Sequence, residues 1–232
     1  MELGGNAPFI VFDDADIDTA VEGAVQSKYR NAGQTCVCTN RILVQRNVLD
    51  TFTQKFIHAV AALKVGDGTA DHVNIGPMIS AQALNKVKQL VDESVAAGAH
   101  IAYQTDASAL GENFLAPLVL TGVTNDMAVA QQEIFGPVSP IIAFENEADA
   151  IEIANDTEFG LAAYFYARDI GRIWRVAEGL QYGMVGINEG LISNAAAPFG
   201  GVKQSGNGRE GSHYGLHDYL EIKYLCLGGL DK

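Results

Sequence analysis

The chain has 232 residues, of which 48% are hydrophobic and 19% charged, so it can bury a substantial core and is neither disordered nor fibrous in composition. Its formal net charge of −13 excludes nucleic acid as the expected partner, because binding a phosphate backbone requires clustered Lys and Arg.

The cysteine count and the hydropathy pattern indicate the compartment. Three cysteines, an odd number, do not form the pattern of a disulfide framework, so a reducing environment is expected. No apolar run approaches the roughly 18 residues that span a bilayer. The N-terminus also lacks the basic start and apolar core of a secretory signal. We therefore expect a cytoplasmic protein without a membrane partner.

The first predicted elements surround a possible reactive thiol. Apolar residues recur at spacings of three and four after an acidic cluster at 13–16, which predicts a helix from Ile17 to about Tyr29. This helix should end before Gly33 and leave Cys36 in a loop or at the start of a strand. The next predicted elements are a strand at Arg41–Gln45, an amphipathic helix at Val48–Leu63, and a helix from the N-cap Ser80 to Ala97.

The rest of the chain alternates strands with helices. Strands are predicted at His100–Gln104, Leu118–Thr121, Ser139–Phe144, Leu161–Ala167 and Met184–Ile187, and helices at Ala148–Asn155 and Ile170–Glu178. This alternation predicts an α/β fold with a largely parallel twisted sheet flanked by helices. The tail Tyr219–Cys226 alternates apolar and polar residues, which predicts a terminal strand that either edges its own sheet or pairs with another subunit.

Cys36 is the residue with the clearest catalytic potential, because a thiol is intrinsically nucleophilic and partly ionised near neutral pH. Gly33 gives the preceding loop access to conformations that present backbone N–H groups to a thiolate. The alternative role for Cys36 is that of a small buried packing residue. A cysteine-protease site is not indicated, since the five histidines show no matching signature. Metal binding is not expected either, since Cys36, Cys38 and Cys226 lack ligand spacing.

A formal Gly-x-Gly-x-x-Gly pattern occurs at residues 206–211. A dinucleotide-binding fingerprint must follow a strand and open a helix. Here the pattern lies in a glycine-rich loop, so we interpret it as a coincidence.

Separated segments of the chain resemble the aldehyde dehydrogenase superfamily in order and spacing, over essentially the whole length. These segments are Met1–Asn6, Asn31–Cys38, Glu133–Pro137, Pro198–Gly201 and Ser205–Glu210. The paired thiols Cys36 and Cys38, Arg30 ahead of them, and Leu191–Asn194 resemble the succinate-semialdehyde branch in particular. Within the matching segments, Asn207 departs from the apolar residue that the family usually has.

The resemblance implies an activity and roles for four residues. Cys36 would attack the aldehyde to give a thiohemiacetal, hydride would pass to NAD or NADP, and water activated by Glu2 would hydrolyse the thioester. Glu133 would hydrogen-bond the nicotinamide ribose, and Phe135 would flank the cofactor. The expected reaction is the oxidation of succinate semialdehyde to succinate. Glutarate semialdehyde, one methylene longer, fits as well, and so do both NAD and NADP.

Further roles concern the substrate and a second thiol. Arg30 is chemically suited to bind a substrate carboxylate, with a surface cation as the alternative. Ser193 and Phe199 are the other substrate-binding candidates. Cys38 is a redox-switch candidate, because similar paired thiols in the semialdehyde branch can form a disulfide that stops activity; simple packing is the alternative. Cys226 is expected to be structural.

The resemblance also divides the chain. Residues 1–217 would be the catalytic domain, with 1–8 as the end of a cofactor domain that precedes it, and 218–232 would be an oligomerisation strand and tail. We therefore expect a homodimer or a dimer of dimers, and little dehydrogenase activity from the chain alone. The alternatives are a non-catalytic oligomerisation module and a residual thiol esterase that uses Cys36.

Overall fold

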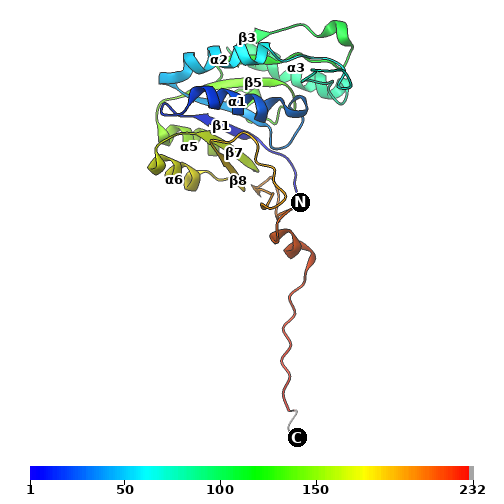
Figure 1. Ribbon diagram of the computed structural model, residues 1–232, viewed down its shortest axis with the longest axis vertical. Coiled ribbons are helices and arrows are strands. Elements are labelled where there is room, and N and C mark those ends of the chain that lie inside the picture. Colours follow the sequence, from blue (N-terminus) through cyan, green and yellow to red (C-terminus); the bar gives the residue numbers. More distant parts are fainter. Residues whose placement is uncertain (230–232) are drawn as a thin grey trace.

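The computed structural model describes residues 1–229, and its centre is a seven-stranded sheet with helices on both faces (Figure 1). Neighbouring strands are parallel except for β3 and β4. In sheet order the strands are β3 (His100–Gln104), β4 (Leu118–Thr121), β5 (Val138–Phe144), β2 (Thr39–Gln45), β1 (Ala7–Val11), β7 (Ala162–Tyr166) and β8 (Met184–Ile187). The expected α/β fold with a largely parallel sheet is confirmed.

Two hydrophobic cores lie against this sheet, one on each face. Helices α1 (Ile17–Tyr29) and α2 (Leu49–Ala61) bury their apolar sides in one core. Helices α3 (Ala81–Ala96), α5 (Glu147–Asn155) and α6 (Ile170–Gly179) contribute to the other. The short helix α4 (Ala128–Gln131) packs beside α3. No helix within residues 1–229 is both long and apolar enough to cross a membrane.

Smaller elements connect these layers. Strands β6 (Phe159–Gly160) and β9 (Val202–Lys203) form a separate antiparallel pair. The 3-10 helices are η1 (Arg30–Gly33), η2 (Arg46–Val48), η3 (Ser108–Leu110) and η4 (Tyr214–Tyr219). The Gly-x-Gly-x-x-Gly pattern at 206–211 opens no α-helix, as the sequence indicated. The stretch before it was expected to be loop, but it contains the two-residue strand β9.

The elements with strong local signals lie close to where the sequence predicts them, whereas the central strand β1 was missed. Helix α1 ends at Tyr29, and the Ser80 side chain caps α3 by accepting a hydrogen bond from the Ala83 amide. All five residues of β1 are buried, so the strand shows none of the alternation that marks a half-exposed strand. β1 begins at Ala7, inside the segment 1–8 that the resemblance assigns to the end of a cofactor domain.

The expected terminal strand does not edge the sheet of its own chain. Tyr219 ends η4, and residues 220–229 extend away from the body without strand pairing (Figure 1). Their apolar side chains are solvent-exposed, with Ile222 at 100% and Tyr224 at 85%. A strand forms only where another strand satisfies its backbone groups, and the described part of the chain offers this segment none.

Hydrogen bonds from Arg41, on the central strand β2, connect the sheet to the segment that precedes β1. Its guanidinium is fully buried and donates hydrogen bonds to the carbonyls of Asn6, Ile153 and Ala154, at 2.7 to 3.1 Å. Asn6 is itself buried and donates through Nδ2 to the Ala130 carbonyl. These bonds fix the start of β1 relative to β2 and α5.

Candidate active site

Three segments of the site enter three adjacent parallel strands. Glu2 precedes β1, Cys36 precedes β2, and Glu133–Phe135 precede β5. The amino ends of neighbouring parallel strands meet at one edge of a sheet, so residues far apart in sequence converge there. Open α/β sheets usually bind ligands at the opposite, carboxyl edge.

The loop before Cys36 has an unusual backbone. Asn31, Ala32 and Gly33 all have positive φ angles, of 51°, 57° and 75°. For the two residues that are not glycine this costs about 1–2 kcal/mol each. A Cβ on Gly33 would lie 2.3 Å from the carbonyl oxygen of Gly136, so the position needs glycine for two reasons.

Gln34 holds this loop in place. Its backbone amide and its Nε2 both donate to the Asn31 carbonyl, at 3.1 and 3.2 Å. Its Oε1 accepts from the Ile79 amide at 2.8 Å, and Nε2 also donates to the carbonyl of Pro77. One side chain therefore joins the strained loop to the segment that leads into α3.

The backbone before β1 passes directly against Cys36. A Cβ on Gly5 would lie 2.5 Å from the Cys36 carbonyl oxygen, so any larger residue would separate the two segments. The Gly5 amide donates to the Glu133 carboxylate at 3.0 Å. Gly5 thus brings Cys36 and Glu133 to the same short stretch of chain.

The segment around Glu2 is held by a loop from the other end of the chain. The Leu3 amide donates to the Ser205 carbonyl at 3.0 Å, and the buried Ser205 hydroxyl donates to the Gly4 carbonyl at 2.7 Å. The amide of Gly160 donates to the same hydroxyl. This explains why a Ser–Gly segment so distant in sequence accompanies the Cys36 motif.

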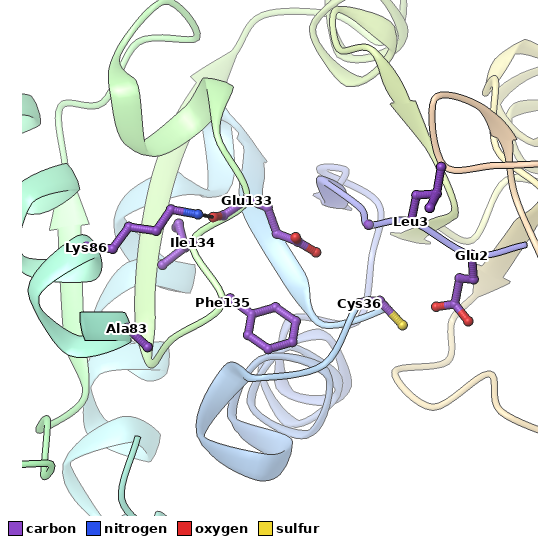
Figure 2. A pocket seen from close by; sticks show the side chains of 9 residues that line it. Glu2, Leu3, Cys36, Ala83, Lys86, Glu133, Ile134 and Phe135 are labelled. Atoms are coloured by element: carbon purple, nitrogen blue, oxygen red, sulfur yellow. Dashed lines mark hydrogen bonds between the residues drawn. The ribbon is translucent and has the colours of Figure 1, made fainter. Parts of the chain in front are cut away.

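A cavity of about 430 Å³ joins these side chains (Figure 2). Figure 2 shows the Cys36 sulfur facing the Glu2 carboxylate, while Glu133 and the Phe135 ring lie on the other side of Cys36. Phe135 is 39% exposed, which is unusual for a large apolar residue. Its backbone has a φ of +53°, in the left-handed region that non-glycine residues rarely adopt. The cavity is lined by Glu2, Leu3, Gly4, Cys36, Ala83, Lys86, Glu133, Ile134 and Phe135.

Two carboxylates determine the electrostatics around Cys36. Burial, together with the neighbouring Glu2 and Glu133 carboxylates, raises the pKa of the Cys36 thiol to about 12. Burial also raises the pKa of Glu133, and the Gly5 amide and the Lys86 ammonium act in the opposite direction. As the described chain stands, Cys36 is a protonated thiol at neutral pH.

The structure does not bring every predicted residue into this cavity. Arg30 is exposed at the start of η1, and Ser193 is exposed in an irregular segment. Phe199 is half-buried and packs against the same core cluster as Cys36, while its backbone pairs with Glu210. None of the three lines the 430 Å³ cavity, so their substrate roles stay predictions.

The two other cysteines differ from each other. Cys38 is buried, and its thiol donates to the Arg30 carbonyl at 3.6 Å. Cys226 was expected to be structural, but it is exposed on the extended tail. All three cysteines are free, and no group of three or more His, Cys, Asp or Glu within residues 1–229 is placed to hold a metal ion.

The sequence did not reveal Lys86 or the residues that support the site. Lys86 lines the cavity and donates from Nζ to the Glu133 carbonyl at 3.2 Å. It lies on an amphipathic helix, where an isolated lysine reads as a solvated residue. Asn40 accepts from the Ile134 amide and donates to Asn6, but its position inside a strand gave no signal of this role.

Comparison with known proteins is consistent with this geometry. The family model described as the aldehyde dehydrogenase family matches residues 1–225. The chain belongs to the aldehyde dehydrogenase family. The matched residues include three titratable groups of the cavity, Glu2, Cys36 and Glu133.

Three similar proteins illustrate the relationship within the aldehyde dehydrogenase family. A "3-sulfolactaldehyde dehydrogenase" of Pseudomonas putida is 57% identical over 232 residues, covering 100% of this chain and 48% of that protein. A "glutarate-semialdehyde dehydrogenase" of Pseudomonas aeruginosa is 58% identical, and the match covers 99% of this chain and 48% of that protein. The crystal structure of succinate-semialdehyde dehydrogenase from Burkholderia pseudomallei is 61% identical in sequence and superposes with a TM-score of 0.96. The match covers 98% of this chain and 47% of that protein. The chain therefore spans about half the length of the relatives it matches.

The electrostatic environment of Cys36 yields a prediction about its ionisation. Glu2→Gln removes a negative charge that opposes the thiolate, so the pKa of Cys36 should fall and alkylation at pH 8 should accelerate by about tenfold, the equivalent of one pKa unit. The rate is measured with iodoacetamide across a pH series, with site-resolved mass spectrometry to separate Cys36 from Cys38.

Glu221→Gln, on the exposed tail, is the matched control and should leave the Cys36 profile unchanged. An equal or slower rate in Glu2→Gln would contradict the placement of Glu2 beside the thiol.

Proposed function

We propose that this chain carries the catalytic cysteine site of an NAD(P)-dependent aldehyde dehydrogenase whose substrate is a short aldehyde with a terminal anion, succinate semialdehyde first. The observation that carries the proposal is one cavity that joins a thiol, Cys36, to two carboxylates, Glu2 and Glu133, with an exposed aromatic ring beside them. The three free cysteines fit a reducing compartment, so we place the activity in the cytoplasm.

The residues of the cavity support a two-stage reaction. The Glu2 carboxylate faces the Cys36 thiol and can accept its proton, so the resulting thiolate attacks the aldehyde carbon and forms a thiohemiacetal. After oxidation the substrate remains on Cys36 as a thioester. Glu2 then takes a proton from a water molecule that attacks the thioester, which releases the acid and restores the thiol.

The cavity also fits the nicotinamide end of NAD or NADP. Glu133 offers carboxylate oxygens that can accept hydrogen bonds from ribose hydroxyls, and the Phe135 ring offers a flat apolar face. Two carboxylates in one cavity favour a cationic ring, and the oxidised nicotinamide is cationic. When bound, the cofactor supplies the hydride acceptor that the side chains lack.

A terminal anion on the substrate is suggested by the relatives and by Arg30. The relatives are named for 3-sulfolactaldehyde, glutarate semialdehyde and succinate semialdehyde, all of them short aldehydes that carry an anionic group. Arg30 lies six residues before Cys36 and makes no ion pair within the described residues, so its guanidinium is free to bind two oxygens. Ser193 and Phe199 are proposed to complete this subsite.

A chimera tests the proposed function. We predict that the 232-residue chain alone reduces little NAD⁺ or NADP⁺ with succinate semialdehyde. Fusing it to the part of the Burkholderia pseudomallei enzyme that it does not match should yield robust reduction, measured by absorbance of the reduced nicotinamide. In that chimera Cys36→Ser should lower kcat by at least about 10³-fold, because the covalent route is lost.

The chimera also tests the subsite. Arg30→Met should raise KM for succinate semialdehyde far more than for butanal, which lacks the carboxylate. A chimera that folds and binds NADP⁺ but oxidises neither aldehyde would contradict the proposed function, and so would full activity after Cys36→Ser.

The exposed tail supports a second proposal, that two copies of this chain associate through residues 219–229. The segment alternates apolar and polar side chains, its apolar members are exposed, and its backbone is unpaired within the described chain. Within residues 1–229, β8 ends the sheet with one edge unpaired, so a strand from a second copy can extend it. The expected state is a homodimer or a dimer of dimers.

Removing residues 219–232 should therefore convert the oligomer into a monomer, as measured by light scattering after size-exclusion chromatography. The substitution pair Ile222→Lys and Tyr224→Lys should act similarly because it charges one face of the proposed strand, whereas Glu221→Gln should not. An oligomer of unchanged mass after the deletion would exclude the tail as the contact.

A further inference from the structure

Asn40, the second residue of β2, makes three hydrogen bonds with its side-chain amide and is 4% exposed. Its Nδ2 donates to the Gln132 carbonyl at 2.9 Å and to Asn6 Oδ1 at 2.7 Å. Its Oδ1 accepts from the Ile134 amide at 2.9 Å. Both N–H groups of this amide and its oxygen are therefore in use, which fixes the orientation of the side chain.

Two of these bonds enclose Glu133. The carbonyl before Glu133 and the amide after it are both bound by Asn40, as the backbone of a neighbouring strand would bind them. The Lys86 ammonium donates to the carbonyl of Glu133 itself at 3.2 Å. Both peptide groups that flank Glu133 are therefore held, which sets the direction in which its side chain leaves the backbone.

The third bond of Asn40 leads to the group that binds the Glu133 carboxylate. Asn6, which is 1% exposed, accepts this bond and directly follows Gly5 in the chain. The Gly5 amide donates to Glu133 Oε1 at 3.0 Å. Asn6 is also held through its carbonyl, which accepts from Arg41 at 3.1 Å. Asn40 therefore fixes both the backbone that presents the carboxylate and the backbone that binds it.

We propose that Asn40 is a positioning residue that sets the direction of the Glu133 carboxylate, through the backbone on either side of Glu133 and through Asn6. The inference rests on the proposed function in one respect, namely that Glu133 accepts hydrogen bonds from a ribose of NAD or NADP. A carboxylate that is already oriented loses little side-chain freedom when the cofactor binds. Cofactor affinity should therefore depend on Asn40, which lies outside the lining of the 430 Å³ cavity.

Asn155 makes the same pair of backbone bonds away from the cavity and provides a matched control. Its Nδ2 donates to the Gly179 carbonyl at 2.8 Å, and its Oδ1 accepts from the Gln181 amide at 2.9 Å, so its amide encloses Leu180. Asn155 and Leu180 both lie outside the lining of the cavity. A substitution of Asn155 therefore removes an equivalent bridge without touching the carboxylate.

The first test measures amide hydrogen exchange in the 232-residue chain by NMR. Asn40→Asp has nearly the same shape and keeps an acceptor for the Ile134 amide, but it loses both donated bonds. The Gly5 amide should then exchange at least about tenfold faster, because the segment that carries it is no longer tied to β2. In Asn40→Ser, whose side chain is too short for the bridge, the Ile134 amide should exchange faster as well. Asn155→Asp should leave both amides unchanged.

The second test measures cofactor binding in the chimera by calorimetry. Asn40→Asp should raise Kd for NADP⁺ about tenfold, while kcat at saturating NADP⁺ and KM for succinate semialdehyde change by less than about threefold. In a Glu133→Ala background, which lacks the carboxylate to be positioned, Asn40→Asp should raise Kd by less than about twofold. Asn155→Asp should leave Kd unchanged, even if it lowers the melting temperature as much as Asn40→Asp does.

An equal rise in Kd with and without the Glu133 carboxylate would overturn the proposal, because Asn40 would then act on the fold as a whole. Unchanged exchange of the Gly5 and Ile134 amides in both Asn40 variants would overturn it as well. The two proposals fail separately: the expected exchange pattern together with an inactive chimera would contradict the dehydrogenase function and still support the positioning by Asn40.

Discussion

Parallel pairing of β5, β2 and β1 is the constraint on which the site depends. Each strand is entered from the same edge by one chemically important segment, so the pairing register fixes where Glu133, Cys36 and Glu2 lie relative to one another. The segments before β1 and β2 approach each other closely at Gly5, where the backbone has no room for a Cβ beside the Cys36 carbonyl. A slip of one residue would turn every side chain of a strand to the other face and would disassemble the cavity.

The same constraint explains which features the sequence could predict. The bounds of α1 and the Ser80 cap follow from local periodicity and side-chain chemistry, and both agree with the structure. β1 was missed because a strand buried on both faces resembles any short apolar run. For the tail the sequence predicts a strand that the structure does not show, because its alternating pattern finds no partner strand within the described chain.

The sequence predicts only those site residues that belong to recognisable motifs. Cys36, Glu2 and Glu133 could be selected through the family resemblance, and the structure brings them to one cavity. Lys86 and Gln34 could not, because their roles depend on contacts between elements rather than on spacing along the chain.

The central claim is that the close approach at Gly5 sets the Cys36 thiol against Glu2, and a double-mutant cycle tests it most directly. The measured quantity is the pH midpoint of Cys36 alkylation in Glu2→Gln, Gly5→Ala and the double variant, each verified as folded by near-UV circular dichroism. If Gly5→Ala separates the segments, Glu2→Gln should shift the midpoint far less in that background, while the shift should persist in Gly68→Ala, where a Cβ meets nothing within 4 Å. The same shift in all three backgrounds would contradict the account.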